Sequence, residues 1–245
     1  MKGKKILFMG GKYVGYECLS FLISKKYNVV GCYVNLNDVA KDRWYPSVTE
    51  LCLKHEIPVF CYKKVNSKSS EKNIRRLNLD IIVVVYYDQI LKENIIKIPK
   101  LGCINLHLSL SQVHRGCYPT TWSLIRGDKH TGVTLHYITQ KIDEGPVIGQ
   151  KKIRIKNDWT GKDLYFKVSD LGVKLFKEAF PALDKTKPYS LDCTNSEYHK
   201  REFPCREIVL DEKTKDKIRA LSFEPFPLPY IMVGKRKFIF KEVKE

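Results

Sequence analysis

Polar side chains suited to proton transfer stand in a short stretch of an otherwise apolar sequence. Asn105 and His107 are two residues apart in Ile104-Asn-Leu-His-Leu108, and Ser109 continues the same spacing. Because side chains alternate along a strand, we expect these three on one face. An amide can donate a hydrogen bond to the oxygen of a tetrahedral intermediate while a neighbouring imidazole moves a proton. The pattern therefore predicts acyl-transfer chemistry at this strand.

A carboxylate from a later stretch completes the group. Asp143 begins an Asp-Glu-Gly turn, and we expect it to orient the imidazole of His107 and to stabilise its charge. A lone histidine is more often a hydrogen-bonded core residue, but the three groups together argue against that reading here. Ser109 lacks the Gly-x-Ser-x-Gly sequence of a nucleophilic serine, and Cys103 and Cys117 lie beside no assigned base. We therefore expect direct attack by a substrate amine rather than a covalent acyl-enzyme.

The elements that position these residues follow an α/β pattern. Apolar runs alternate with helix-period segments over residues 1–155, as in a Rossmann-like, mostly parallel sheet flanked by helices. Ile81–Val85 has no polar alternation, so we expect a central strand buried on both faces. The predicted strands are Lys5–Gly10, Asn28–Val34, Pro58–Tyr62, Ile81–Tyr87, Cys103–Leu108, Gly132–Ile138 and Val147–Ile155. The predicted helices are Val14–Lys26, Ser47–His55, Ser70–Leu77, Thr120–Arg126 and Thr160–Phe180.

The sequence changes character after residue 183. Residues 184–204 are polar and contain Pro, Lys and Ser, which is typical of a linker or an extended arm. A short helix over Asp211–Leu221 is expected to follow it. We therefore expect a catalytic domain over residues 1–183 and a small C-terminal appendage over residues 184–245.

A β-hairpin is predicted near the C-terminal end. Its strands are Tyr230–Val233 and Arg236–Lys241, and Gly234-Lys235 suits a two-residue type II′ turn. An isolated hairpin is at best marginally stable, so it must pack on the main domain or on another subunit. We expect the appendage to contact the acceptor substrate, to form a homodimer interface, or both.

The charge balance directs attention to anionic partners. The chain has 44 Lys and Arg against 27 Asp and Glu, a formal charge of +17, which suits nucleic acid or a phosphorylated small molecule. The lysines are spread along the chain, so a solvated lysine-rich surface explains the charge equally well. Gly10-Gly-Lys-Tyr-Val-Gly15 could meet an anion at a helix N-terminus, but it matches neither a dinucleotide fingerprint nor a P-loop and is read as a tight turn.

Membrane and secretory features are not expected. The longest uncharged apolar run, Ile81–Tyr87, is far below the roughly 20 residues that span a bilayer, and no membrane binding is predicted. Met1–Gly10 does not read as a signal peptide, so we expect a cytoplasmic protein. The eight cysteines contain no Cys-x-x-Cys pair, which argues against a zinc ribbon and favours buried free thiols.

Together these motifs resemble the folate-dependent formyltransferases over about the first 180 residues. The matching residues are Asn105-Leu-His107, Ser109-Leu110, Arg115-Gly116, Pro119 and Asp143-x-Gly145. The resemblance implies 10-formyltetrahydrofolate as co-substrate, a catalytic set of Asn105, His107 and Asp143, and no metal. The stretch Val84–Leu91 is similar to the family's pterin loop. This similarity implies folate contacts from Tyr87, Gln89, Ile90 and Leu91.

The match has two departures beside the expected site. The family usually continues Ser-Leu-Leu-Pro before a Tyr-Arg-Gly, whereas this chain reads Ser109-Leu-Ser-Gln-Val-His-Arg-Gly116. Asp88 stands where a glycine is common. Both changes fall on loops, so they bear on acceptor contacts more than on the reaction.

The residues after the catalytic region bear on the acceptor. The tRNA enzymes of this family carry a further C-terminal barrel, for which too few residues follow the linker here. Arg219–Tyr230 instead resembles the segment that follows the catalytic domain in nucleotide-sugar N-formyltransferases. The resemblance therefore implies a nucleotide-linked 4-amino-4,6-dideoxyhexose, of the dTDP-linked type, as acceptor and does not favour nucleic acid.

Four residues are candidate acceptor contacts on chemical grounds alone. Lys12 and Arg115 could meet a diphosphate, and Phe223 or Tyr230 could stack on the base; a surface or packing role is equally open for each. Two other functions stay open as well. One is a truncated methionyl-tRNA formyltransferase, favoured only by the charge, and the other is a non-catalytic basic α/β domain that binds nucleic acid.

Overall fold

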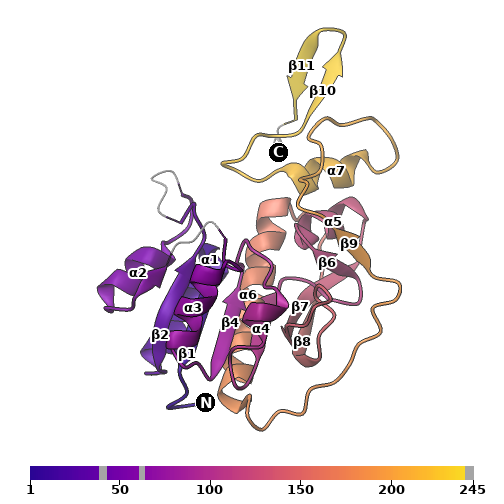
Figure 1. Ribbon diagram of the computed structural model, residues 1–245. Helices are drawn as coiled ribbons and strands as arrows, with labels where there is room; N and C mark the ends of the chain where they lie inside the picture. The colour runs from indigo at the N-terminus through magenta and orange to yellow at the C-terminus, as the bar shows by residue number, and fades with distance from the viewer. Residues whose placement is uncertain (39–42, 61–63, 241–245) are drawn as a thin grey trace.

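A seven-stranded sheet forms the centre of the computed structural model, which describes residues 1–38, 43–60 and 64–240 (Figure 1). The strand order is β3-β2-β1-β4-β5-β7-β8. The strands are β1 Ile6–Gly10, β2 Val29–Val34, β3 Val59–Phe60, β4 Ile81–Val85, β5 Cys103–His107, β7 His130–Tyr137 and β8 Val147–Arg154. β1 to β5 pair in parallel, and β7 pairs antiparallel with both β5 and β8. The predicted α/β class with a mostly parallel sheet is confirmed.

Both faces of the central strands are buried in apolar side chains. Along β1, Phe8 packs in one hydrophobic cluster and Met9 in the other. Along β4, Val83 and Ile82 divide in the same way, and every residue of that strand is buried. This confirms the prediction of a central strand covered on both sides. Each such side chain contributes roughly 1.5–3 kcal/mol by leaving water.

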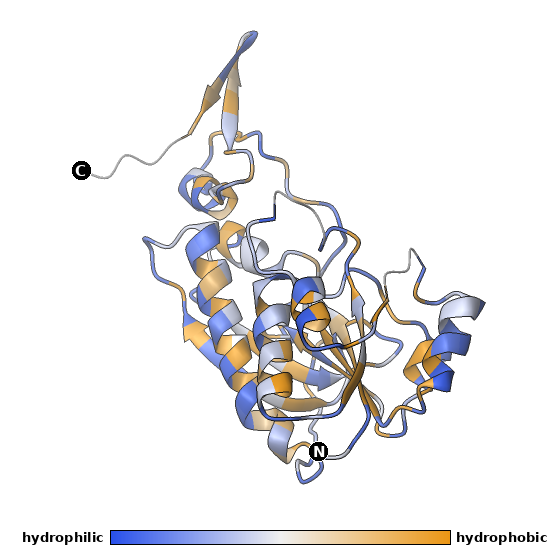
Figure 2. Ribbon diagram, turned by 90° about the vertical axis from the view of Figure 1, so that its left-hand side faces the viewer, coloured by the Kyte–Doolittle hydropathy of each residue, from blue (hydrophilic) through white to orange (hydrophobic). Residues whose placement is uncertain are grey.

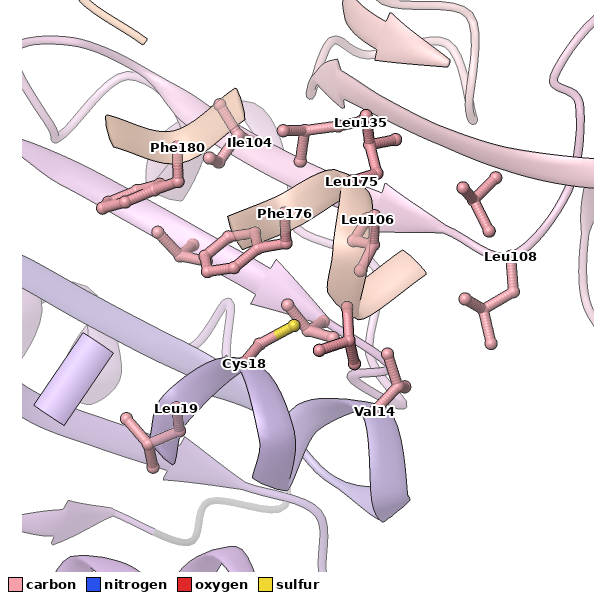
Figure 3. Packing of buried hydrophobic residues seen from close by; sticks show 14 of the residues in the cluster. Val14, Cys18, Leu19, Ile104, Leu106, Leu108, Leu135, Leu175, Phe176 and Phe180 are labelled. Carbon is pink, nitrogen blue, oxygen red and sulfur yellow. The ribbon is translucent and has the colours of Figure 1, made fainter. Parts of the chain in front are cut away.

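Helices cover the two faces. They are α1 Lys12–Ser24, α2 Val48–Lys54, α3 Lys68–Arg76, α4 Glu93–Ile96, α5 Pro119–Ile125, α6 Gly161–Ala179 and α7 Thr214–Leu221. The longest, α6, begins at a reciprocal capping box in which Thr160 and Asp163 each accept from the other's backbone N–H. Figure 3 shows Phe176 of this helix and the following Phe180 packed beside Ile104 of β5. α1 and α6 therefore cover the face opposite α3 and α4.

The chain leaves the sheet at His107, so the prediction that Ser109 shares a strand face with Asn105 is wrong. Ser109 lies fully buried in the following turn, where its hydroxyl donates to the carbonyl of Leu110 at 3.4 Å. The hydroxyl of Thr134 in β7 donates to the carbonyl of Ser109 at 2.7 Å. The turn thus satisfies this buried carbonyl with a side chain in place of a strand partner.

The segment after residue 183 contains a short strand that the sequence analysis did not predict. β9, Glu197–His199, pairs in parallel with β6, His114–Gly116. The helix α7 then buries Ala220 and Leu221. The arm is therefore attached to the main domain through β9 and α7, and also through Tyr189, which exchanges backbone hydrogen bonds with Val147 of β8.

The predicted hairpin consists of β10, Tyr230–Val233, and β11, Arg236–Ile239. Its two-residue turn has φ of +60° at Gly234, as a type II′ turn requires. The expected end of this hairpin at Lys241, like that of the predicted strand at Tyr62, lies outside the described residues. The hairpin projects from the end of the molecule opposite the N-terminus (Figure 1).

Apolar residues follow the sheet and the inner sides of the helices (Figure 2). The hairpin is an exception, because four of its apolar side chains are exposed: Met232, Val233, Phe238 and Ile239. In the described parts of the chain, no helix combines the length and the apolar character needed to cross a bilayer.

Candidate active site

The site lies at the edge of the sheet where the parallel strands end. β4 and β5 are parallel neighbours, with Val84 opposite Asn105. The loop that follows β4 and the polar residues of β5 therefore emerge together. Ligands of open α/β sheets bind outside this edge.

Asn105, His107 and Asp143 meet at this edge. The Nδ2 atom of Asn105 lies 3.3 Å from Oδ1 of Asp143 and donates to it. The Nδ1 atom of His107 lies 3.6 Å from the other carboxylate oxygen, Oδ2. Asp143 reaches them from the turn between β7 and β8, where its φ is +55°. The structure thus brings the three predicted residues together around one carboxylate.

The hydrogen bonds of His107 distinguish its two ring nitrogens. Nε2 lies 2.9 Å from the main-chain carbonyl oxygen of His114. A carbonyl oxygen can only accept, so Nε2 carries a proton. In the neutral ring the lone pair is then on Nδ1, the nitrogen that faces Asp143. Nδ1 is therefore the atom that can take up a proton, beside a carboxylate that would stabilise the resulting charge.

Asp143 is an almost fully buried carboxylate whose neighbours keep it ionised. Burial by itself raises the pKa of Asp143, but His107, His136 and the backbone N–H of Gly116 together hold that pKa well below its ordinary value. The Gly116 N–H donates to Oδ2 at 2.9 Å. A carboxylate with such donors keeps its charge at neutral pH.

His136 belongs to the same group, although it was not among the residues predicted for the site. β7 places it directly opposite Asn105. Its Nδ1 donates to the carbonyl of Tyr137 at 2.9 Å, and its Nε2 lies 3.3 Å from the amide nitrogen of Asn105 and 3.4 Å from Asp143. The only sequence signal was its place on the predicted strand Gly132–Ile138, since the antiparallel register could not be known in advance.

Arg115 secures the turn that presents Asp143. One guanidinium nitrogen, Nη1, bonds with the carboxylate of Glu144 and lies 3.5 Å from the carbonyl of Ile142. Its Nε donates to the hydroxyl of Ser196 at 2.6 Å. Arg115 therefore joins the residues on both sides of Asp143 to the C-terminal arm. Its contact with a diphosphate stays a prediction.

The predicted folate loop follows β4 and is held by its own side chains. Gln89 accepts from the backbone N–H of Val65 at 2.8 Å and donates to the hydroxyl of Tyr87 at 3.2 Å. Leu91 is buried in the core cluster next to α4, whereas the side chain of Ile90 is exposed. Leu91 can therefore offer a ligand mainly its backbone groups.

The predicted acceptor contacts lie in separate places. The ammonium of Lys12 is 4.3 Å from the ring centroid of Tyr45, and burial lowers the pKa of Lys12. The ring centroid of Phe223 lies 5.1 Å from that of Trp44, and the ammonium of Lys12 also lies over the Trp44 ring. Lys12 and Phe223 thus share one aromatic cluster. Tyr230 instead lies in the projecting hairpin, with the ammonium of Lys237 above its ring.

A protein-family model described as formyl transferase matches residues 25–180. The chain belongs to the formyltransferase family. The match covers β2 to α6 and includes Asn105, His107 and Asp143.

Curated relatives match this formyltransferase over much of its length. The bifunctional polymyxin resistance protein ArnA of Wigglesworthia glossinidia brevipalpis is 36% identical over 98% of this chain and 38% of its own. A methionyl-tRNA formyltransferase of Clostridioides difficile is 35% identical over 74% of this chain and 60% of its own. The chain therefore spans less than two thirds of either relative.

Solved structures share the fold across nearly the whole chain. WlaRD, a sugar 3N-formyl transferase crystallised with dTDP and 5-N-formyl-THF, is 23% identical with a TM-score of 0.78 and covers 96% of this chain and 84% of its own. An N-formyltransferase from Helicobacter canadensis, in complex with folinic acid and dTDP-3-aminofucose, is 22% identical with a TM-score of 0.79, over 95% and 85%. A 4-N formyltransferase from Francisella tularensis is 18% identical with a TM-score of 0.80, over 99% and 98%. These likenesses establish the fold, including the segment after residue 183.

A substitution at Gly116 tests the contact that supports Asp143. Gly116 has φ of +83°, and an added Cβ would lie 2.2 Å from the carbonyl oxygen of His199. Gly3 has nearly the same φ, +81°, with open space around it. We expect Gly116→Ala to lower the free energy of unfolding by about 2–4 kcal/mol, and Gly3→Ala by about 1 kcal/mol for the backbone conformation alone. Urea denaturation followed by circular dichroism measures both, and equal losses would contradict the packing described.

Proposed function

We propose that this protein transfers the formyl group of 10-formyltetrahydrofolate to the amine of a nucleotide-linked amino sugar. The observation that carries the proposal is the convergence of Asn105, His107 and Asp143 at the carboxyl edge of the sheet. The family match supports formyl transfer. One solved relative was crystallised with 5-N-formyl-THF and dTDP, and another is in complex with folinic acid and dTDP-3-aminofucose. These complexes support a folate and a nucleotide-linked amino sugar as the two substrates.

The proposed reaction is a direct attack. The lone pair of the neutral sugar amine forms a bond to the formyl carbon, and the carbonyl π electrons move to its oxygen. Asn105 Nδ2, held only by contacts of 3.3 Å, turns to donate to that oxygen. Nδ1 of His107 takes the proton from the attacking nitrogen, and Asp143 stabilises the imidazolium. The C–N10 bond then breaks, and N10 of the folate receives the proton.

The two parts of the chain divide these tasks in our proposal. Residues 1–183 carry the transfer, with Tyr87, Gln89, Ile90 and Leu91 next to the pterin. Residues 184–245 contribute acceptor and subunit contacts. The cluster of Lys12, Trp44 and Phe223 offers a cation and aromatic faces, which suit a diphosphate and a base. The acceptor sugar is a dTDP-linked 4-amino-4,6-dideoxyhexose.

A methionyl-tRNA acceptor is the second candidate. It is favoured by the 35% identity to a methionyl-tRNA formyltransferase and by the net charge of +17. Binding to tRNA through lysine contacts with phosphates would weaken steeply as salt increases.

An acceptor panel separates these functions. The protein is incubated with 10-formyltetrahydrofolate and, in parallel, with 3-amino and 4-amino dideoxyhexoses linked to dTDP or UDP, and with methionyl-tRNA. We expect mass spectrometry to show a gain of one formyl group on a dTDP-linked 4-amino sugar. Transfer to methionyl-tRNA alone would replace the proposal with the second candidate. A chain that formylates none of these acceptors, while it binds the folate, would contradict both.

Substitutions at the three catalytic residues test the mechanism. We expect Asn105→Ala to lower kcat by about 10²–10³, because an oxyanion donor acts in the transition state and little in the ground state. His107→Ala and Asp143→Asn should lower kcat by at least as much, with KM for the folate nearly unchanged. His130→Gln, an exposed histidine at the start of β7, is the control and should retain full activity. Near-normal turnover of a folded Asn105→Ala or His107→Ala variant would refute these roles.

We also propose that the hairpin forms a homodimer interface. Both of its faces carry exposed apolar side chains, and such a strand pair is marginal on its own. We expect Phe238→Asp to convert a dimer to a monomer in analytical ultracentrifugation. Lys235→Gln, in the turn of the same hairpin, makes the same change of one unit in charge without removing apolar area and should leave the dimer intact. A wild-type monomer at tens of micromolar concentration would end this proposal.

A further inference from the structure

A second group of ionisable side chains lies where the C-terminal arm meets the catalytic domain. His114 of β6 and His199 of β9 are both buried, and Glu197 of β9 lies beside them. In the parallel register of these strands, His114 is opposite Glu197, and His199 follows two residues later on the same face. One ligand atom from each of the three residues lies within 4.8 Å of the others.

We propose that His114, Glu197 and His199 form a binding site for one Zn²⁺ ion. The ligands are Nδ1 of His114, Nε2 of His199 and a carboxylate oxygen of Glu197, with water in the fourth position. Two imidazoles and a carboxylate are a ligand set that zinc accepts in proteins. None of these three side chains contributes to the formyl-transfer step proposed above, so the ion has a structural role.

The distances fit a tetrahedral site. Ligand atoms about 2.0–2.1 Å from zinc lie roughly 3.3 Å from one another. Nδ1 of His114 is 3.0 Å from Nε2 of His199, and Nε2 of His199 is 3.6 Å from Oε2 of Glu197. Both distances are within a few tenths of an ångström of the separation expected between two ligand atoms of a tetrahedral zinc site. The carboxylate of Glu197 is partly exposed, so it can move the remaining distance toward His114.

A neighbouring carboxylate prepares His114 as a ligand. Nε2 of His114 lies 2.8 Å from Oδ2 of Asp128. An ionised carboxylate accepts only, so Nε2 carries the proton, and the lone pair of the neutral ring is on Nδ1. A carboxylate behind a coordinating histidine is the usual second contact of protein zinc sites, where it fixes the tautomer and raises the basicity of the ligand.

Aromatic stacking holds the ring of His199 in place. Its ring stacks on the indole of Trp122 with centroids 4.5 Å apart and planes inclined by 7°. A histidine coordinates metal as the neutral imidazole. Without metal its Nε2–H donates to His114, and on binding that proton moves to Nδ1, so the two rings lose no proton.

The charges around the two histidines favour a cation. Asp128 and Glu197 are two carboxylates, and one guanidinium, Arg126, is paired with Glu197 at 2.9 Å. With both rings neutral, these groups leave an excess of one negative charge. A bound cation would join β9 of the arm to β6, whose His114 carbonyl accepts from the catalytic His107.

Direct metal binding tests the site without an activity assay. Untagged full-length protein is freed of metal by a chelator, passed through a desalting column and titrated with Zn²⁺ against a competing indicator. We expect one equivalent to bind to the wild type and to raise its unfolding temperature. Co²⁺ in place of zinc should give the absorption of a tetrahedral site with nitrogen and oxygen ligands and no thiolate charge-transfer band.

Two variants remove a proposed ligand, a third changes the carboxylate behind His114, and a fourth is a control. We expect His199→Gln to weaken zinc binding by more than 100-fold, and Glu197→Gln, a change at a partly exposed position that leaves the core intact, by at least tenfold. Asp128→Asn retains all three ligands and should weaken binding by about 10–100-fold. His55→Gln replaces an exposed histidine on α2's C-terminal end and should change nothing.

Three results would overturn the proposal. The first is a wild type that binds no zinc at concentrations of tens of micromolar. The second is unchanged affinity in both His199→Gln and Glu197→Gln. The third is a thiolate band in the cobalt spectrum, which would assign the metal to cysteines.

Discussion

The carboxylate of Asp143 sets the main physical constraint on the site. A buried charge without partners costs several kcal/mol, so its oxygens must be surrounded by donors. The Gly116 N–H of β6 and the amide of Asn105 on β5 donate to these oxygens, and Nδ1 of His107, also on β5, lies 3.6 Å from Oδ2. Asn105 and His107 are also the groups that the proposed formyl transfer would use. The requirement to stabilise one buried charge therefore also assembles the groups that we propose to be catalytic.

The sheet explains why those segments meet. Parallel strands end at one edge, so β4 and β5 place the predicted folate loop and Asn105 side by side. β7 then returns antiparallel to β5, which places His136 against Asn105 and brings the turn with Asp143 back to the same edge. Arg115 fixes that turn through Glu144 and Ile142. The polar site is thus carried by rigid elements with apolar clusters on both faces.

Sequence reasoning succeeded where a local pattern carries the signal. The apolar run of β4 predicted its burial, and Asn105 and His107 were found by their spacing of two. It failed where the outcome depends on distant partners. Ser109 continues the spacing, yet the chain turns because Thr134, far along the sequence, satisfies its carbonyl. β6 and β9 have only three residues each and form because they pair with each other. Neither is long enough to show the alternation of apolar and polar residues that predicts a strand.

The pairing of β6 with β9 also changes how the C-terminal arm is understood. The composition after residue 183 suggested a linker, but the carbonyl of His199 accepts from the N–H of Cys117 at 2.9 Å and packs against Gly116. Gly116 in turn donates to Asp143, and the adjoining His114 accepts from His107. Two of the three proposed catalytic side chains, Asp143 and His107, therefore contact β6, the strand with which β9 of the arm pairs. A boundary at residue 183 separates two regions of composition, while the geometry of the active site depends on residues from both sides of it.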